Sequence, residues 1–179
     1  MNTITLGDKT FVQYILATDI DEAITRIANQ ISKDYEHDCP VFMITLNGAV
    51  FFAVDLLKKI KIDTYITSIR LSSYEGTSST SEIKEIMGLK EDLSGRRVIV
   101  LEDIVDTGTT YEHLVRLLEK ENVKDIRIAT LAFKPDAYTK PYPVHYTGFS
   151  IPNKFIVGYG LDYDGRGRNL CDIYQIVTK

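Results

Sequence analysis

The sequence predicts an α/β fold in which a mostly parallel central sheet is flanked by helices. Short apolar runs typical of strands alternate along the chain with segments whose apolar residues recur at helical spacing. The run Val98–Leu101 is apolar at every position, as expected for a strand that helices cover on both faces. The chain has 179 residues, 44% of them hydrophobic, which suffices for one full core. We therefore expect a single domain over residues 1–179, with its core at about 20–150.

The first part of the chain is predicted to hold a helix, a strand and a second helix. Apolar residues recur at helical spacing between positions 20 and 31, and Asp19 or Asp21 is suited to open this helix. Residues 40–46 are typical of a buried strand. The next helix is expected over 48–57, after a short turn.

Later elements continue the alternation of strands and helices. Strand character returns at residues 62–71, and 72–81 are mostly Ser, Thr, Gly and Tyr, which predicts either a disordered loop or a lid. Beyond this loop we expect a strand at 98–102, a helix at 107–120, a strand at 126–134 and, after a proline-punctuated connection, an apolar segment at 155–159.

Charge and cysteine content exclude several classes of function. The chain has 21 basic and 25 acidic residues, a net charge of −4, and no polybasic run, so neither nucleic acid nor an anionic membrane is an expected partner. Cys39 and Cys171 lie far apart without metal-ligand spacing, which indicates neither a disulfide framework nor a zinc site. No apolar run approaches membrane-spanning length and the N-terminus does not resemble a signal peptide, so we expect a cytoplasmic location.

The most informative feature is the point at which the buried strand ends in two carboxylates. Glu102 and Asp103 follow the apolar run directly. Ligands of parallel sheets bind beyond the carboxyl ends of the strands. Because adjacent carboxylates repel each other, this pair is suited to ribose hydroxyls or to a divalent cation.

The turn after these carboxylates predicts a phosphate site. Asp106 to Thr110 lead into a helix whose first backbone amides have no intrahelical partner, and Gly108 lets a ligand approach the main chain. Thr107, Thr109 and Thr110 add hydroxyl donors, so a phosphate monoester could be held almost without cationic side chains. The alternative is an ordinary helix N-cap formed by Asp106 or Thr107.

Residues 98–110 resemble the phosphoribosyl-pyrophosphate signature of the type I phosphoribosyltransferases. Residues 151–163 resemble the purine-binding segment of the hypoxanthine-guanine branch of that family, and 70–74 resemble the start of its mobile loop. With 45–48 upstream, the similarity extends from about Val41 to Arg168. The resemblance implies the type I phosphoribosyltransferase fold, with a small hood subdomain formed by the N-terminal segment and about 151–179.

The resemblance also assigns residues to phosphoribosyl pyrophosphate. It implies that Glu102 and Asp103 hold the ribose hydroxyls and Mg2+, and that Asp106 is the catalytic base near N7 of the purine. The segment that binds ribose and the 5′-phosphate comprises Glu102, Asp103, Ile104, Asp106, Thr107, Gly108, Thr109 and Thr110. The residues implied to bind pyrophosphate are Leu46, Asn47, Gly48, Ser73, Tyr74 and Arg168.

The pyrophosphate turn departs from the family pattern at one position. The family frequently has Lys where this chain has Asn47, and it often carries a cis peptide in this turn, which we assign to Leu46-Asn47 as a hypothesis. The alternatives are a plain strand-to-helix turn at 46–49, a surface loop that never closes at Ser73 and Tyr74, and an exposed surface arginine at Arg168.

The purine site implied by the resemblance lies in the last third of the chain. Lys134 and Lys154 would reach O6, which favours 6-oxopurines over adenine, although solvated lysines are common at strand ends. Phe155 would stack on the base with Ile156 packed nearby; without the resemblance, Phe155 would be assigned to the core. Asp162 matches a carboxylate that binds a second Mg2+.

The function implied is purine salvage. A Mg2+-dependent transferase would move the 5-phosphoribosyl group from phosphoribosyl pyrophosphate to N9 of hypoxanthine or guanine, and the resemblance implies a homodimer or homotetramer. One alternative is an enzyme of the same fold that prefers xanthine. The other is a non-catalytic regulator that binds nucleic acid, which the charge of −4 disfavours.

Overall fold

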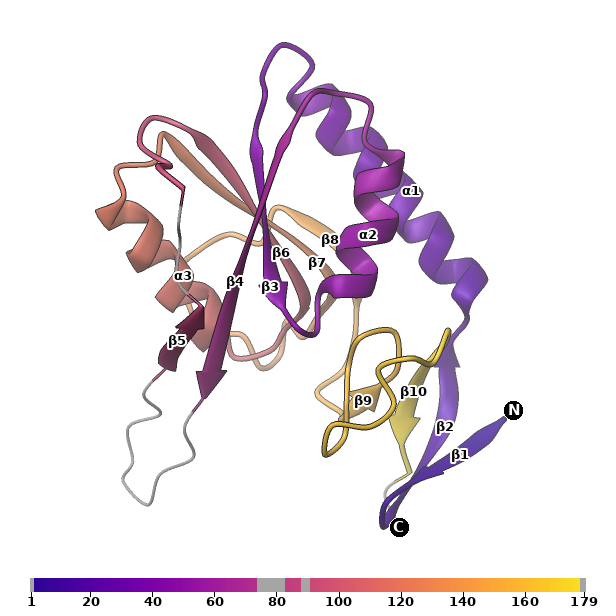
Figure 1. The fold of residues 1–179 in the computed structure, drawn as a ribbon. Helices are drawn as coiled ribbons and strands as arrows, with labels where there is room; N and C mark the ends of the chain where they lie inside the picture. Colours follow the sequence, from indigo (N-terminus) through magenta and orange to yellow (C-terminus); the bar gives the residue numbers. More distant parts are fainter. Residues whose placement is uncertain (1, 74–82, 88–90, 178–179) are drawn as a thin grey trace.

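The computed structural model describes residues 2–73, 83–87 and 91–177, and its main feature is a six-stranded sheet (Figure 1). All neighbouring strands pair in parallel except the two at one edge, which pair antiparallel. The prediction of a mostly parallel sheet is therefore confirmed. In spatial order the strands are β5 (Ile83–Met87), β4 (Tyr65–Ser73), β3 (Val41–Leu46), β6 (Arg97–Val105), β7 (Asp125–Phe133) and β8 (Tyr146–Ser150).

Helices cover both faces of this sheet (Figure 1). α1 (Ala17–Asp34) and α2 (Val50–Lys59) pack side by side on one face, and α3 (Thr109–Lys120) lies on the other. Successive side chains of a strand point to opposite faces, and β6 follows this rule. Ile99 and Leu101 join the core beneath α1 and α2, whereas Val98 and Val100 join the core beneath α3. The expectation that this strand is buried on both faces is correct.

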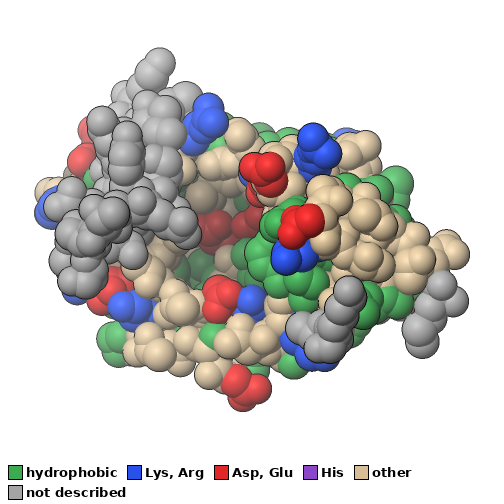
Figure 2. Space-filling model, turned by 90° about the horizontal axis from the view of Figure 1, so that it is seen from below, with side chains coloured by type: hydrophobic (Ala, Val, Ile, Leu, Met, Phe, Trp, Pro, Cys, Tyr) green, Lys and Arg blue, Asp and Glu red, His purple; other side chains and the backbone are tan. Residues whose placement is uncertain are grey.

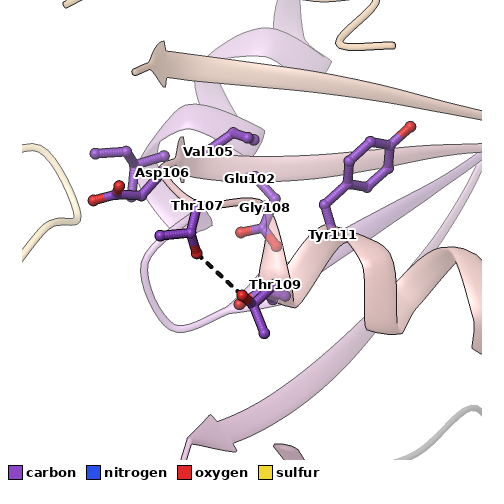
Figure 3. A pocket seen from close by; sticks show the side chains of 9 residues that line it. Glu102, Val105, Asp106, Thr107, Gly108, Thr109 and Tyr111 are labelled. Carbon is purple, nitrogen blue, oxygen red and sulfur yellow. Dashed lines mark hydrogen bonds between the residues drawn. The ribbon is translucent and has the colours of Figure 1, made fainter. Parts of the chain in front are cut away.

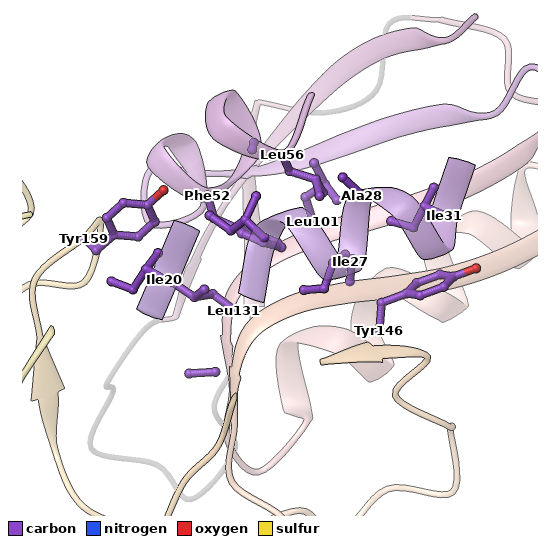
Figure 4. Packing of buried hydrophobic residues seen from close by; sticks show 14 of the residues in the cluster. Ile20, Ile27, Ala28, Ile31, Phe52, Leu56, Leu101, Leu131, Tyr146 and Tyr159 are labelled. Atoms are coloured by element: carbon purple, nitrogen blue, oxygen red, sulfur yellow. The ribbon is translucent and has the colours of Figure 1, made fainter. Parts of the chain in front are cut away.

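The larger core lies between α1, α2 and the sheet (Figure 4). The helical spacing predicted between residues 20 and 31 accounts for it, because Ile20, Ile24, Ile27 and Ile31 are all 0–1% exposed. Phe52 and Leu56 of α2 complete the layer and are fully buried. This packing fixes α2, and with it the turn that precedes α2, against the sheet.

Several helix ends differ from those predicted. α1 begins at Ala17 rather than at Asp19 or Asp21, because Asp19 lies in the first turn, where its carboxylate accepts a hydrogen bond from the Leu16 amide at 3.4 Å. α2 begins at Val50 instead of Gly48. α3 begins at Thr109 instead of Thr107, since Gly108 at its N-cap has a left-handed backbone with φ of 84°.

A second, four-stranded antiparallel sheet lies beyond the carboxyl ends of β3 and β4 (Figure 1). We call this sheet and its connections the hood. It combines the N-terminal segment with the last part of the chain around Phe11, Val157 and Tyr174, all of which are buried. The hood was expected from these two parts of the chain, but its strands were not individually predicted. In spatial order they are β1 (Thr3–Leu6), β2 (Lys9–Ile15), β10 (Ile173–Ile176) and β9 (Ile156–Val157).

Hydrogen bonds attach the hood to the helices. The carboxylate of Asp172 accepts from the Gln13 amide group and from the backbone N–H of Ala17, both at 2.7 Å, and so links the hood to the start of α1. The Tyr159 hydroxyl donates to Asp55 of α2 at 2.5 Å. Burial and this carboxylate raise the pKa of Tyr159. The hood is therefore held in one position relative to the carboxyl ends of the parallel strands.

Two further expectations concern features outside the sheets. Cys39 and Cys171 are both exposed free cysteines. Within residues 2–73, 83–87 and 91–177, no helix is long and apolar enough to cross a membrane.

Candidate functional site

A cavity of about 160 Å³ lies where β6 meets α3 (Figure 3). It is on the face of the molecule seen in Figure 2, where acidic side chains lie inside a hollow. The segment that lines it is the one that sequence analysis selected for ribose and phosphate. The lining residues are Glu102, Ile104, Val105, Asp106, Thr107, Gly108, Thr109, Thr110 and Tyr111.

The start of α3 presents unpaired donors to this cavity. The first helical hydrogen bond runs from the Glu112 amide to the Gly108 carbonyl at 2.9 Å, so the three preceding amides have no intrahelical acceptor. No side chain caps the helix, and the Thr107 and Thr109 hydroxyls instead lie 3.1 Å from each other (Figure 3). The alternative of an ordinary N-cap at Asp106 or Thr107 is therefore wrong. Free amides and hydroxyls at a helix N-terminus form a site suited to a phosphate.

Two carboxyl groups lie at the floor of the site within β6 itself. The strand continues to Val105, so Glu102 and Asp103 lie inside it and not at its end, where the predicted strand of 98–102 placed them. Burial, followed by the charge of Asp103, raises the pKa of Glu102 well above its ordinary value, and the Thr45 hydroxyl partly opposes this. Burial is also the main reason that the pKa of Asp103 rises to about 6. Both groups would be stabilised by a cation or by hydroxyl donors.

Three segments distant in sequence converge beside Asp103. The Leu46-Asn47 peptide bond is cis, as hypothesised, and the next residue is Gly48. A Cβ atom at Gly48 would overlap the Asp103 carboxylate, and one at Gly160 would overlap the Gly48 carbonyl oxygen. Glycine at both positions therefore allows the predicted pyrophosphate turn, the β6 carboxylate and the hood to meet at van der Waals distance.

An ion pair on the hood side completes this group of residues. Arg168 Nη2 lies 2.6 Å from Asp162 Oδ1, and Nη1 donates to the Gly160 carbonyl at 2.6 Å. Asp162 Oδ2 accepts from the Gly165 amide at 2.7 Å. Arg168 lowers the pKa of Asp103 and Asp162 raises it, so both groups act electrostatically on the floor of the site.

A second ion pair includes Asp106, which lines the cavity. Lys134 Nζ is 2.6 Å from Asp106 Oδ2, and the lysine is 6% exposed. The strand register explains the pairing, because Val105 of β6 is opposite Phe133 of β7 and each charged residue comes next in its chain. Sequence analysis selected both residues but did not predict that they pair. The alternative of a solvated Lys134 is wrong.

The predicted purine segment has one ring available to a ligand. Phe155 is 45% exposed, so its assignment to the core is wrong. Its ring packs edge-on against Tyr163 at 6.0 Å between centroids and tilted against Phe11 at 6.3 Å. Lys154 beside it is exposed, while Ile156 is buried in β9. An aromatic surface supported from behind and open in front suits a planar base.

The remaining predicted residues are only partly described. The backbone of Ser73 ends β4, whereas Tyr74 and most of the predicted 72–81 loop lie outside the described residues. Sequence reasoning missed Tyr138 and Lys140, whose side chains a Cβ at Gly108 would overlap. They belong to the proline-punctuated connection after β7, which carries no motif. The signal in the sequence that could have pointed to them was Gly108, because a glycine allows another group to approach the main chain closely.

The described residues contain no group of three or more His, Cys, Asp and Glu arranged for a metal ion. Glu102, Asp103 and Asp162 thus do not form such a cluster on their own. Among the described atoms, however, Glu102 Oε1 is a buried oxygen without a hydrogen-bond partner. Mg2+ is commonly held by one or two carboxylates together with substrate phosphates, and this donor set fits that pattern.

Comparisons with known proteins show what the chain is similar to. The phosphoribosyl transferase domain model matches residues 16–164. The chain is 40% identical over 166 residues to a hypoxanthine-guanine phosphoribosyltransferase of Mycobacterium tuberculosis, covering 89% of this chain and 82% of that protein. It is 39% identical over 154 residues to a hypoxanthine-guanine-xanthine phosphoribosyltransferase of Tritrichomonas foetus, covering 85% of this chain and 84% of that protein. A solved hypoxanthine-guanine phosphoribosyltransferase of Bacillus anthracis has a TM-score of 0.87 and 34% identity, covering 92% of this chain and 98% of that one.

Proposed function

The chain belongs to the phosphoribosyl transferase family, and on that premise we propose that it is a purine-salvage enzyme acting on hypoxanthine and guanine. It transfers the 5-phosphoribosyl group of phosphoribosyl pyrophosphate to the base and yields IMP or GMP and pyrophosphate. The observation that carries this proposal is the cavity at the start of α3, where unpaired amides and threonine hydroxyls lie in the same cavity as the buried carboxyl group of Glu102. Such a site suits a ribose with a phosphate at its 5′ position.

The reaction proceeds by attack of purine N9 on C1 of the ribose as the bond from C1 to pyrophosphate breaks, with inversion at C1. The transition state resembles an oxocarbenium ion. Glu102 and Asp103 hold the ribose hydroxyls, with Ile104 lining the cavity, and the amides and hydroxyls of 107–110 hold the 5′-phosphate. Fixing the ribose at both ends orients C1 for attack.

Asp106 is proposed to act as the general base near N7 of the purine. Its carboxylate is already held by the ammonium of Lys134 at 2.6 Å, which fixes its position at the edge of the cavity. Lys134 and Lys154 face O6 of the base, Phe155 stacks on it and Ile156 packs nearby. Cationic donors at O6 favour 6-oxopurines over adenine.

Pyrophosphate is proposed to bind at the turn of Leu46, Asn47 and Gly48 and at Arg168, with Ser73 and Tyr74 contributing from the loop. A planar guanidinium suits paired phosphate oxygens, and Arg168 is already oriented toward this turn by its bond to Gly160. Asn47 supplies no positive charge, so Arg168 has the larger electrostatic role here.

We propose that Mg2+ is the cofactor and that Glu102 and Asp103 hold it, directly or through water. When bound there, Mg2+ would neutralise the negative charge that develops on the leaving pyrophosphate. Asp162 is proposed for a second Mg2+, although both of its oxygens already accept bonds from Arg168 and Gly165. A second ion would share the Asp162 carboxylate with these two donors.

Nucleotide formation from phosphoribosyl pyrophosphate tests the proposal when hypoxanthine, guanine, xanthine and adenine are supplied separately, with and without Mg2+. We expect IMP and GMP to form at comparable rates and adenine to be inert. Xanthine as the best base would support the xanthine-preferring alternative. This base is included because the name of the Tritrichomonas relative contains xanthine. No product with any base would refute the proposal and favour a regulator.

Three broader properties are also proposed: the domain organisation, the location and the oligomeric state. We propose a single domain over residues 1–179, a cytoplasmic location, and a homodimer or homotetramer. For self-association, α2 exposes Val50, Phe51 and Val54, an apolar surface that a second copy would cover. Light scattering across a dilution series tests the oligomer, and a constant monomer mass would refute it.

A further inference from the structure

We propose that Lys140 is a positioning residue for the 5′-phosphate, acting by neutralising Glu112 in the first turn of α3. This inference rests on the proposed function, because it assigns the phosphate of the ribose to the start of that helix. Lys140 belongs to the connection between β7 and β8, outside the sequence motif that forms the phosphate turn.

The connection between β7 and β8 braces the phosphate turn from behind. The Thr139 amide and hydroxyl both donate to the Thr107 carbonyl at 3.4 Å. A Cβ atom at Gly108 would overlap the Tyr138 ring and the Lys140 side chain, so both lie directly on the turn. The Tyr138 hydroxyl donates to the Tyr142 carbonyl at 2.6 Å, which holds the connection in this shape. The aliphatic part of Lys140 is therefore packed over Gly108.

The ammonium of Lys140 is directed to Glu112. Lys140 Nζ lies 2.7 Å from Glu112 Oε2, and both side chains are only 22–23% exposed. Arg116 Nη2 also reaches Glu112, at 3.0 Å from Oε1, but its side chain is 66% exposed. An exposed ion pair is strongly screened by water, whereas a partly buried one is screened less. Lys140 is therefore the more effective of the two partners.

The phosphate turn itself explains why this neutralisation matters. Residues 105–111 contain no Lys or Arg, and they include the carboxylate of Asp106. Glu112 donates its backbone N–H to the Gly108 carbonyl, so its charge belongs to the same first turn of α3 as the amides that face the cavity. A dianionic phosphate at those amides would be repelled by an uncompensated Glu112. Lys140 removes that repulsion without occupying the cavity.

The test compares Lys140→Met, which keeps the aliphatic stem, with Arg116→Met, a matched control on the exposed partner. We would measure the dissociation constants of IMP and of inosine, which lacks the phosphate, by calorimetry, together with kcat and the KM of phosphoribosyl pyrophosphate. For Lys140→Met we expect IMP binding to weaken and KM to rise by about three- to tenfold, as for loss of a partly buried ion pair, with inosine binding and kcat nearly unchanged. Arg116→Met should change these values less than about twofold.

A double variant separates charge neutralisation from packing. Adding Glu112→Gln to Lys140→Met should restore IMP binding, because the uncompensated carboxylate is then gone. Lys140→Arg should retain wild-type binding. Unchanged IMP affinity in Lys140→Met, or no recovery in the double variant, would overturn the inference. If Lys140→Met does not fold, Glu112→Gln alone still decides, since weaker binding of IMP in that variant contradicts a repulsive role for Glu112. Failure of the wild type to form nucleotide would instead refute the proposed function.

Discussion

The ammonium of Lys134 lies 2.6 Å from the carboxylate of Asp106, and this pair joins the ends of two neighbouring parallel strands. Lys134 N–H also donates to the Val105 carbonyl at 2.9 Å, which continues the β6–β7 ladder one step beyond the strands. The pair therefore belongs to the sheet scaffold rather than to a loose loop. Asp106, the proposed base, is thereby held in one orientation before a purine binds.

Replacing the proposed base should reduce turnover far more than affinity. For Asp106→Asn we expect kcat to fall by about 10²–10⁴-fold, the usual contribution of a positioned general base, while the KM values of both substrates change little. Steady-state kinetics with each substrate varied in turn checks this. Equal losses in kcat and in substrate affinity would argue against a base role and for a purely binding one.

The buried carboxyl groups predict an unusual pH dependence of stability. The pKa of Asp103 is raised from 3.8 to about 6, so between these values the folded chain binds more protons than the unfolded one. Its contribution therefore makes the free energy of unfolding decrease as pH rises from about 4 to about 6 and level off above that. Urea unfolding at several pH values, without Mg2+, measures this.

The Asp103→Asn variant is the control for that measurement, because it removes the titrating group but keeps the side-chain shape. We expect the difference in stability between wild type and variant to change across the window from about pH 4 to about pH 6. Mg2+ should stabilise the wild type more at pH 7, where Asp103 is ionised, than at pH 5. A pH-independent difference between the two proteins would contradict the assignment.

Truncating Phe155 should affect the base and not the fold. The ring is 45% exposed, so Phe155→Ala removes little core packing, whereas loss of a base–aromatic stack costs about 1–3 kcal/mol. We expect the KM of the purine to rise roughly 5- to 150-fold, with an unchanged KM for phosphoribosyl pyrophosphate. Tyr65→Ala, at a ring that is 57% exposed on β4, is the control and should leave both values unaltered. A KM of the purine unchanged by Phe155→Ala would rule out stacking.

Two glycines of the hood separate steric overlap from backbone strain. Gly160 and Gly165 both have positive φ, 99° and 75°, but only at Gly160 would a Cβ atom meet another group, the Gly48 carbonyl oxygen. Gly165→Ala should cost about 1 kcal/mol through its backbone conformation alone. Gly160→Ala should cost about 2 kcal/mol more, because the hood must move away from the pyrophosphate turn. Thermal unfolding compares the two, and equal losses would mean that the contact is unimportant.

Local sequence patterns predicted the parts of this molecule that are formed by residues close together in the chain. The helical spacing in α1 and the apolar run in β6 are visible because each residue's environment repeats along the chain. The phosphate turn was also predictable, since its hydroxyls and its glycine are contiguous in the sequence. By contrast, β1, β2, β5, β8 and β10 were not predicted, because apolar and polar residues are mixed in them. β2, for example, is paired with β10, about 160 residues away.

The sequence by itself therefore determined the α/β alternation, the buried strand that carries two adjacent carboxylates and the glycine-containing turn at the start of α3. Only the tertiary structure decided which side chains face one another. Lys134 meets Asp106 because of the β6–β7 register, Gly160 meets Gly48 because the hood packs against α2, and Lys140 lies on Gly108 because the β7–β8 connection folds back. These contacts join residues far apart in the chain, so no local pattern encodes them, and long-range packing has to bring them together.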